Sequence, residues 1–215
     1  MAAEKHLSAQ LVIQNNMMER LLERISLSKY RENFILKGGF LIAAIVGLDS
    51  RATLDLDTTI KGFELSHDVI VRIFEEICRI EIEDDVTFKV NRTTDIRETD
   101  DYPGIRVSLT ACYHSLKVPM KVDVTTGDKI TPREIEYPFR LLFDERSISI
   151  MAYDVETILA EKLETVLSRN IANTRPRDFY DVYILHRLRG TKFDQMILKA
   201  ASEETAKKRG SISVL

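Results

Sequence analysis

The segment 34–60 constrains the fold more than any other part of the chain. Residues 34–36 are apolar and suit a short extended entry, and Lys37-Gly38-Gly39 then supplies a tight turn. An apolar run follows and stops at Gly47, which indicates a short buried helix. Residues 54–60 begin by alternating apolar and polar side chains, as a half-buried strand does. The segment therefore predicts a strand, a glycine turn, a buried helix and a second strand.

The rest of the chain predicts an α+β fold. Apolar residues at helical spacing, and runs rich in β-branched residues between turn formers, mark the other elements. Helices are expected at 6–28, 66–80, 154–168, 176–188 and 193–207, and strands at 87–90, 105–112, 118–125 and 147–151. We expect a mixed sheet flanked by helices over residues 1–152, and a helical C-terminal portion over residues 153–215 that packs on this core. The tail after Arg209 is expected to be loose.

Composition excludes several classes of protein. The 215 residues are 44% hydrophobic and 30% charged, which is typical of a soluble globular chain. The two cysteines, Cys78 and Cys112, lie in apolar stretches without metal-ligand spacing, so we expect reduced thiols and a cytoplasmic protein. The longest apolar run, 40–46, is too short to cross a bilayer, so no membrane role is expected.

Charge divides unevenly along the chain. Residues 155–215 carry 11 basic and 8 acidic side chains, a net +3, whereas residues 1–154 carry 20 and 26, a net −6. The basic part could face a polyanion, or the difference could be ordinary surface charge. Five arginines between residues 169 and 189 contribute to the positive charge of this part: Arg169, Arg175, Arg177, Arg187 and Arg189.

Two aspartates are the first candidates for chemistry. Asp55 and Asp57 are two positions apart on an expected strand, so their carboxylates share one face while Leu54 and Leu56 anchor the other face in the core. Two neighbouring anions repel each other unless a cation lies between them, and Mg²⁺ prefers such oxygen ligands together with nucleotide phosphates. The alternative is a strand that shows two acids to water.

Two further elements strengthen the metal and nucleotide hypothesis. The amides of Gly38 and Gly39 precede a helix, where they could approach a phosphate, although a plain turn would use the same residues. Asp123 alternates with Val122 and Val124 on another expected strand. If that strand lies beside the first, three carboxylates converge in a site for two metal ions.

The helical portion adds a lysine. Lys162 lies at the edge of an apolar helix face, so it either extends to the surface or contacts an anion such as a phosphate. Asp178 and Asp181 open the next helix, where acids also suit the helix N-terminus without any chemistry.

Five short motifs occur in an order that resembles the AbiEii family. They are Lys37-Gly38-Gly39, the run from Arg51 to Asp57, the acid Asp123 on a later strand, Ala160-Glu161-Lys162-Leu163, and Arg177-Asp178-Phe179-Tyr180-Asp181. These nucleotidyltransferase toxins belong to bacterial abortive-infection toxin-antitoxin systems, within the DNA polymerase β-like superfamily, and are similar to the MenT toxins. The resemblance covers nearly the whole chain.

The resemblance implies a fold, an activity and a set of site residues. The fold is the polymerase β-like nucleotidyltransferase core. Gly38, Gly39 and Thr53 are implied to position the nucleotide, Asp55 and Asp57 to bind metal and act in catalysis, and Lys162 to contact the triphosphate. Asp178 is the implied downstream catalytic carboxylate, and Asp123 matches the third metal carboxylate by its place on a strand. Either of the two could deprotonate or orient the acceptor hydroxyl.

The implied function is Mg²⁺-dependent transfer of a nucleotide from GTP or a pyrimidine triphosphate to RNA. The expected acceptor is tRNA, and its modification would block growth in phage defence. A cognate antitoxin that represses transcription is the implied partner, without a required stable complex. Two alternatives stay open: an antibiotic or protein hydroxyl as acceptor, and an inactive module that only binds the nucleotide.

Overall fold

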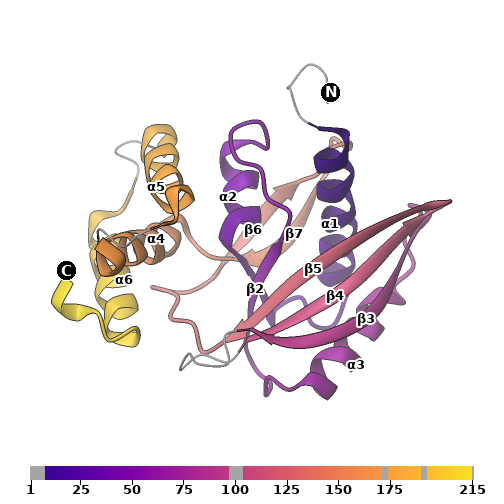
Figure 1. Cartoon of the computed structure of the whole chain (residues 1–215), viewed down its shortest axis with the longest axis horizontal. Coiled ribbons are helices and arrows are strands. Elements are labelled where there is room, and N and C mark those ends of the chain that lie inside the picture. The colour runs from indigo at the N-terminus through magenta and orange to yellow at the C-terminus, as the bar shows by residue number, and fades with distance from the viewer. Residues whose placement is uncertain (1–7, 97–103, 171–173, 190–192, 215) are drawn as a thin grey trace. The chain divides into compact units, whose positions relative to one another are not determined.

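The computed structural model describes residues 8–96, 104–170, 174–189 and 193–214 (Figure 1). The chain divides into two units. The first consists of residues 1–128 and 136–152, and the second of residues 129–135 and 153–215. The expected α+β class is confirmed, because both helices and a mixed sheet form.

A seven-stranded sheet forms the centre of the first unit. Its elements in chain order are α1 (Ala9–Leu27), β1 (Phe34–Lys37), α2 (Gly38–Val46), β2 (Leu56–Ile60), α3 (His67–Cys78), β3 (Val86–Ile96), β4 (Gly104–Tyr113), β5 (Leu116–Thr126), β6 (Ile135–Arg140) and β7 (Ser147–Ala152). The strand order is β3-β4-β5-β2-β1-β7-β6. Strand β2 runs antiparallel to β1 and parallel to β5, so the sheet is mixed.

Three expectations for the strands need correction. The expected strand at 54–60 starts only at Leu56, so Leu54 and Asp55 precede it. The expected strand at 87–90 is part of the longer strand β3, Val86–Ile96. Strand β6 is absent from the predicted strands, because only Phe139 of its six residues is buried and its apolar signal is weak. It lies at one end of the sheet, where the missing amide hydrogen of Pro138 costs little.

Helix α1 forms because its apolar residues recur on one side and its first turn is capped. The Leu11 amide donates to Ser8 Oγ at 3.2 Å. Met18, Leu21 and Ile25 are at most 2% exposed. The helix contacts α3 and strands β3, β5 and β7, so it covers one face of the sheet. Arg24 extends from it to Asp84 in a two-pronged ion pair of 2.8 and 2.9 Å.

The other face of the sheet stays polar at its centre. Leu56, Val122 and Val107 lie in register on β2, β5 and β4, and each is fully buried. The next residues along these strands, Asp57, Asp123 and Arg106, point the opposite way because side chains alternate along a strand. One face of these strands therefore contributes apolar residues to the core, and the other face carries charged residues.

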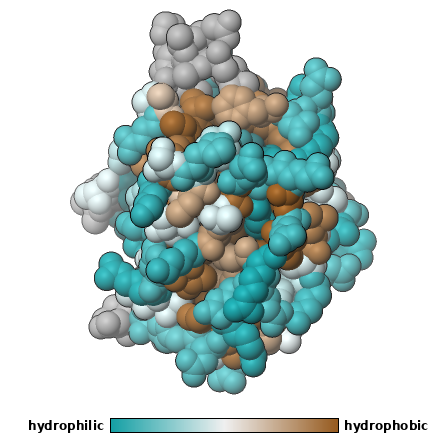
Figure 2. Space-filling view, turned by 90° about the vertical axis from the view of Figure 1, so that its right-hand side faces the viewer, coloured by the Kyte–Doolittle hydropathy of each residue, from teal (hydrophilic) through white to brown (hydrophobic). Residues whose placement is uncertain are grey.

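The first unit presents a polar exterior on the side that lies to the right in Figure 1. Figure 2 shows this side, and hydrophilic residues cover most of it with small apolar areas between them. Both cysteines carry free thiols and are half-buried. Burial raises the pKa of Cys78 to about 11, so this thiol stays protonated at neutral pH. Among the described residues, every helix is too short or too polar to span a membrane.

The second unit is helical. It contains α4 (Val155–Arg169), α5 (Pro176–Arg189), α6 (Gln195–Lys208) and the short 3₁₀ helix η3 (Ile212–Val214). Helix α4 contacts the other three. Its N-terminus is capped by Asp154, which accepts from the Thr157 amide at 2.7 Å.

The tail after Arg209 is more ordered than the sequence suggests. The Arg209 guanidinium pairs with Glu164 at 2.5 Å and with Glu161 at 3.4 Å. The Ser211 hydroxyl donates to Glu164 at 2.7 Å. These contacts tie the chain to α4 up to η3, so the expectation of a loose tail was wrong for the described part.

Candidate active site

The double glycine packs directly against Asp57. Gly38 begins α2 with φ +67, and a Cβ built on it would lie 2.2 Å from Asp57 Oδ2. Only glycine combines this left-handed conformation with so close an approach. The Gly39 amide donates a hydrogen bond to the Asp57 carboxylate. The turn therefore orients Asp57.

Thr53 lies beside the turn. It is buried, and a Cβ on Gly39 would lie 3.1 Å from its hydroxyl oxygen. Asn15 of α1 donates to the Thr53 carbonyl at 3.2 Å, which anchors the loop before β2 to the helix. Gly38, Gly39, Thr53 and Asp57 therefore lie next to one another in the fold.

Asp55 and Asp57 differ in their surroundings. Asp57 is half-buried on β2, whereas Asp55 precedes the strand and is exposed. The expectation that Leu54 anchors the core was wrong, because its side chain is 48% exposed, whereas Leu56 is fully buried. The loop geometry before β2 breaks the strict alternation that the sequence suggests.

A row of four charged residues crosses the sheet at Asp57. Strand pairing places Lys37 beside Asp57, Asp57 beside Asp123, and Asp123 beside Arg106. The expectation that the strand of Asp123 adjoins that of Asp57 is confirmed. The two acids form the middle of the row, and a basic residue lies at each end.

Asp123 is already paired with a cation. The Arg106 Nε and Nη2 atoms donate to its two carboxylate oxygens, both at 2.7 Å. Such a two-pronged contact uses both oxygens in a fixed plane. At the other end of the row, Lys37 forms an ion pair with Asp128, which also accepts from the Thr125 hydroxyl at 3.0 Å.

The electrostatics of Asp57 favour a bound cation. Burial raises the pKa of its carboxyl, and the neighbouring carboxylates of Asp123 and Asp55 raise it further. The Lys37 ammonium and the Gly39 amide lower the pKa but do not reverse the shift. A divalent ion would remove this repulsion.

The donor set fits Mg²⁺ at two of the three predicted ligands. Asp55 and Asp57 offer the hard oxygen atoms that Mg²⁺ prefers. Asp123 is held by Arg106, so it can serve as a ligand only if that ion pair opens. Among the described residues, no group of three or more His, Cys, Asp or Glu side chains is arranged to hold a metal ion.

Lys162 and Asp178 are brought together in the second unit. Lys162 Nζ donates to Asp178 Oδ1 at 2.6 Å and lies 3.1 Å from Asp181 Oδ2. Both aspartates are buried, at 5% and 0% exposure. Lys162 therefore contacts anions, one of the two uses that its position suggests. Asp178 Oδ2 is buried and accepts no hydrogen bond from the described residues.

Arg106 is not among the site residues that the sequence predicts, and the position of Asp181 predicts only an acid that suits a helix N-terminus. Arg106 lies between Ile105 and Val107 on an expected strand. The alternation could have assigned it to the polar face, but not to Asp123 as its partner, because pairing depends on strand order. Asp181 lies one turn after Asp178, a spacing that brings both acids to one side of the helix.

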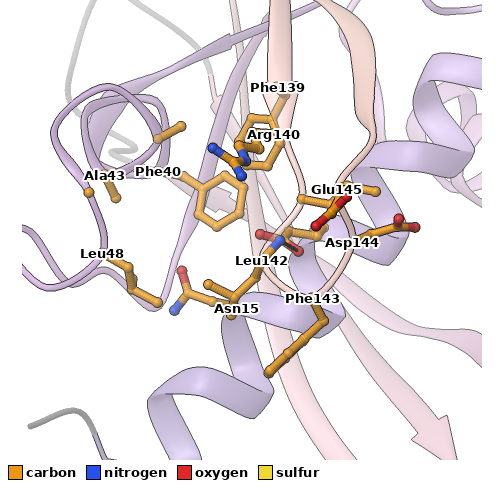
Figure 3. A pocket seen from close by; sticks show the side chains of 14 residues that line it. Asn15, Phe40, Ala43, Leu48, Phe139, Arg140, Leu142, Phe143, Asp144 and Glu145 are labelled. Carbon is orange, nitrogen blue, oxygen red and sulfur yellow. Dashed lines mark hydrogen bonds between the residues drawn. The ribbon is translucent and has the colours of Figure 1, made fainter. Parts of the chain in front are cut away.

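A separate cavity of about 640 Å³ opens in the first unit (Figure 3). The rings of Phe40 and Phe139 stack in its wall with centroids 5.5 Å apart. Glu19 lines it too and accepts from the Leu142 amide at 2.9 Å. Burial raises the pKa of Glu19 to about 7. None of the predicted site residues lines this cavity.

Comparison with known proteins assigns the fold and the family. The sequence model of the AbiEii nucleotidyltransferase toxins of type IV toxin-antitoxin systems matches residues 20–214. No curated protein sequence matches significantly.

Several solved structures share the fold of the polymerase β-like nucleotidyltransferases. A Helicobacter pylori protein thought to be a nucleotidyltransferase has a TM-score of 0.56 at 16% identity, covering 96% of this chain and 80% of its own. The antibiotic-resistance factor ANT(2'')-Ia has a TM-score of 0.54 at 11% identity, covering 94% and 96%. A nucleotidyltransferase-like protein of Paracoccidioides brasiliensis has a TM-score of 0.50 at 13% identity, covering 91% of each chain.

Proposed function

The chain belongs to the AbiEii family and is a nucleotidyltransferase, and on this premise we propose that it transfers a nucleotide from a nucleoside triphosphate to RNA. The family implies a nucleotide substrate and an antitoxin partner. We propose tRNA as the acceptor, GTP or a pyrimidine triphosphate as the donor, and growth arrest in phage defence as the outcome. The reaction would take place in the cytoplasm, and the antitoxin would act as a transcriptional repressor without a required stable complex.

One observation carries the proposal of metal-dependent transfer. Asp57 is fixed by the double glycine, lies beside two other carboxylates and has a raised pKa. Mg²⁺ held by Asp55 and Asp57 would neutralise triphosphate charge and lower the pKa of the acceptor hydroxyl. The amides of Gly38 and Gly39 and the hydroxyl of Thr53 would position the phosphates.

The chemical step follows from this assignment. The acceptor hydroxyl oxygen forms a bond to the α-phosphorus, the bond from that phosphorus to the bridging oxygen breaks, and pyrophosphate leaves with the electron pair. Asp178 or Asp123 takes the hydroxyl proton. Lys162 binds the triphosphate and keeps Asp178 and Asp181 compensated.

The proposal is tested by incubating the purified chain with Mg²⁺, each α-labelled nucleoside triphosphate in turn, and total bacterial tRNA. We expect label in tRNA with the parent chain. With Asp57→Asn we expect at least about 100-fold less label, because the substitution removes a carboxylate that would hold Mg²⁺, and Mg²⁺ would neutralise the triphosphate charge. Asp49→Asn is the control, since it changes an aspartate outside the charged row.

The same assay separates the alternatives. Label in an antibiotic or in protein, with none in tRNA, would replace tRNA as the proposed acceptor. ANT(2'')-Ia, an antibiotic-resistance factor, shares the fold and is the reason to include this arm. Protection against thermal unfolding by a nucleotide, without label transfer to any acceptor, would instead identify an inactive binding module.

A further inference from the structure

Helix α5 has two chemically different sides. Asp178, Asp181 and Leu185 are buried within the second unit, at no more than 5% exposure. Phe179, Tyr180 and Tyr183 are exposed by 50%, 39% and 56%. Among the described residues only two other aromatic side chains, one on β4 and one in the β6–β7 turn, are comparably exposed. Exposed aromatic surface is therefore concentrated on this one helix.

The exposed residues form a stripe along the helix. Tyr180, Tyr183 and Arg187 are three and four residues apart, a spacing that places side chains on the same side of a helix. Arg187 Nη1 donates to the Tyr183 hydroxyl at 3.3 Å, so the guanidinium and the ring are neighbours. Asp178, a predicted site residue, lies on the same helix as this stripe.

The exposed charged side chains near this stripe are all basic. Between residues 174 and 188 they are Arg175, Arg177 and Arg187, and Arg187 lies on the stripe. The acids of the same stretch, Asp178 and Asp181, are buried and paired with Lys162. An anionic partner would therefore meet no exposed carboxylate on α5 itself.

We propose that the exposed side of α5 binds unpaired nucleotides of the RNA acceptor. Bases stack on Phe179 and Tyr183, and phosphates pair with Arg187. Single-stranded RNA combines flat apolar bases with regularly spaced negative charge, which matches flat aromatic rings beside an arginine. The assignment rests on the proposed RNA acceptor and adds where and how this chain would hold it.

Binding measured without turnover tests the surface separately from the reaction. The experiment uses the full chain with Asp57→Asn, so that chemistry is blocked, and a fluorescein-labelled RNA hairpin with an unpaired 3′ end. Phe179→Ala and Tyr183→Ala should each weaken binding roughly 5- to 100-fold in fluorescence anisotropy, because each removes a stacking platform. Arg187→Ala should also reduce the steepness with which affinity falls as salt is added.

Two matched controls exclude general effects of exposed residues. Phe143→Ala removes a ring that is 60% exposed in the first unit, and Lys199→Ala removes an exposed cation of α6. Both should leave RNA affinity within about twofold of the Asp57→Asn parent, because neither lies on α5. Circular dichroism confirms that each variant is folded.

Each outcome decides one of the two hypotheses. RNA affinity that is unchanged in Phe179→Ala, Tyr183→Ala and Arg187→Ala would overturn the α5 surface, even if label transfer to tRNA succeeds. A dimer that Tyr183→Ala converts to monomer in sedimentation, with unchanged RNA affinity, would also overturn it and assign the stripe to a second copy. If binding depends on α5 but no label reaches RNA, the surface stands and the proposed reaction fails.

Discussion

At the scale of single residues, Arg106 determines which carboxylates are available to a metal ion. Its two-pronged contact occupies both oxygens of Asp123, next to Asp57 in the charged row. The arginine thereby reduces the repulsion among the acids when no other cation is bound. A divalent ion that used all three acids would have to replace this contact.

Replacing Arg106 should strengthen the response to Mg²⁺. In Arg106→Ala the three acids have one fewer cation beside them, so we expect a lower melting temperature without metal and a larger increase on adding Mg²⁺ than in the parent. Differential scanning fluorimetry across a Mg²⁺ titration measures both. Arg92→Ala is the control on the neighbouring strand. An equal Mg²⁺ shift in Arg106→Ala and the parent would show that Asp123 takes no part in metal binding.

Glu19 should make stability depend on pH. Its pKa is raised from 4.5 to about 7, so between these values the folded chain binds more protons than the unfolded chain. The free energy of unfolding therefore falls as pH rises through this range, by on the order of 3 kcal/mol for this group. Stability from this group is complete below pH 4.5 and is lost above about pH 7.

Glu19→Gln removes this dependence while its amide oxygen still accepts from the Leu142 amide. Urea unfolding should show that the substitution raises the free energy of unfolding by about 2 kcal/mol more at pH 8 than at pH 5. The exposed Glu64→Gln serves as the control. A change that is the same at both pH values would contradict the assignment.

At the scale of elements, the start of α2 couples a turn to the site. Gly38 has φ +67 and Gly127 has φ +75, but only Gly38 has a neighbour where a Cβ would lie. Alanine substitutions at these two glycines therefore distinguish the cost of backbone strain, which both share, from the cost of a steric clash with Asp57, which only Gly38 has.

Gly38→Ala should destabilise the chain more than Gly127→Ala. We expect about 1 kcal/mol for Gly127→Ala, from the left-handed conformation alone. For Gly38→Ala we expect at least about 3 kcal/mol, because Asp57 must also move. Chemical unfolding measures both, and nucleotide binding should be lost only in Gly38→Ala. Equal effects would mean that the contact with Asp57 relaxes at little cost.

At the scale of the whole molecule, predicted site residues lie in both units. The first unit holds the glycine turn and the charged row, and the second holds Lys162 with its two buried aspartates. Removing one partner of a buried ion pair leaves an uncompensated charge, which is costly in any unit that contains it.

Lys162→Met should therefore affect stability as well as triphosphate binding. Hydrogen exchange should accelerate in α4 and α5, because Asp178 and Asp181 lose their cation. Amides of β2 and β5 should exchange at parental rates. The exposed Lys199→Met is the control. Unchanged exchange in α5 together with weaker nucleotide binding would show that the ion pair contributes little to the fold.

Much of the fold follows from the sequence because its signals are local. The spacing of apolar residues in α1 and α3, the glycines around α2 and the β-branched runs of β4 and β5 each reflect interactions within a few residues. Asp55, Asp57, Gly38 and Gly39 could be selected as site residues for the same reason. Strand β6 was the exception, because only Phe139 of its six residues is buried and its apolar signal is weak.

Contacts between distant side chains depend on how the elements pack. The residue pattern predicts that Asp123 and Arg106 each lie on a strand, but their contact requires β4 and β5 to pair in one register. Lys162 pairs with Asp181 and Glu19 is buried because residues distant in the sequence pack beside them. Tyr183 is exposed because no other element covers it within the described residues. Charge compensation and burial are properties of surroundings, and the surroundings are set by packing between elements rather than by any one segment.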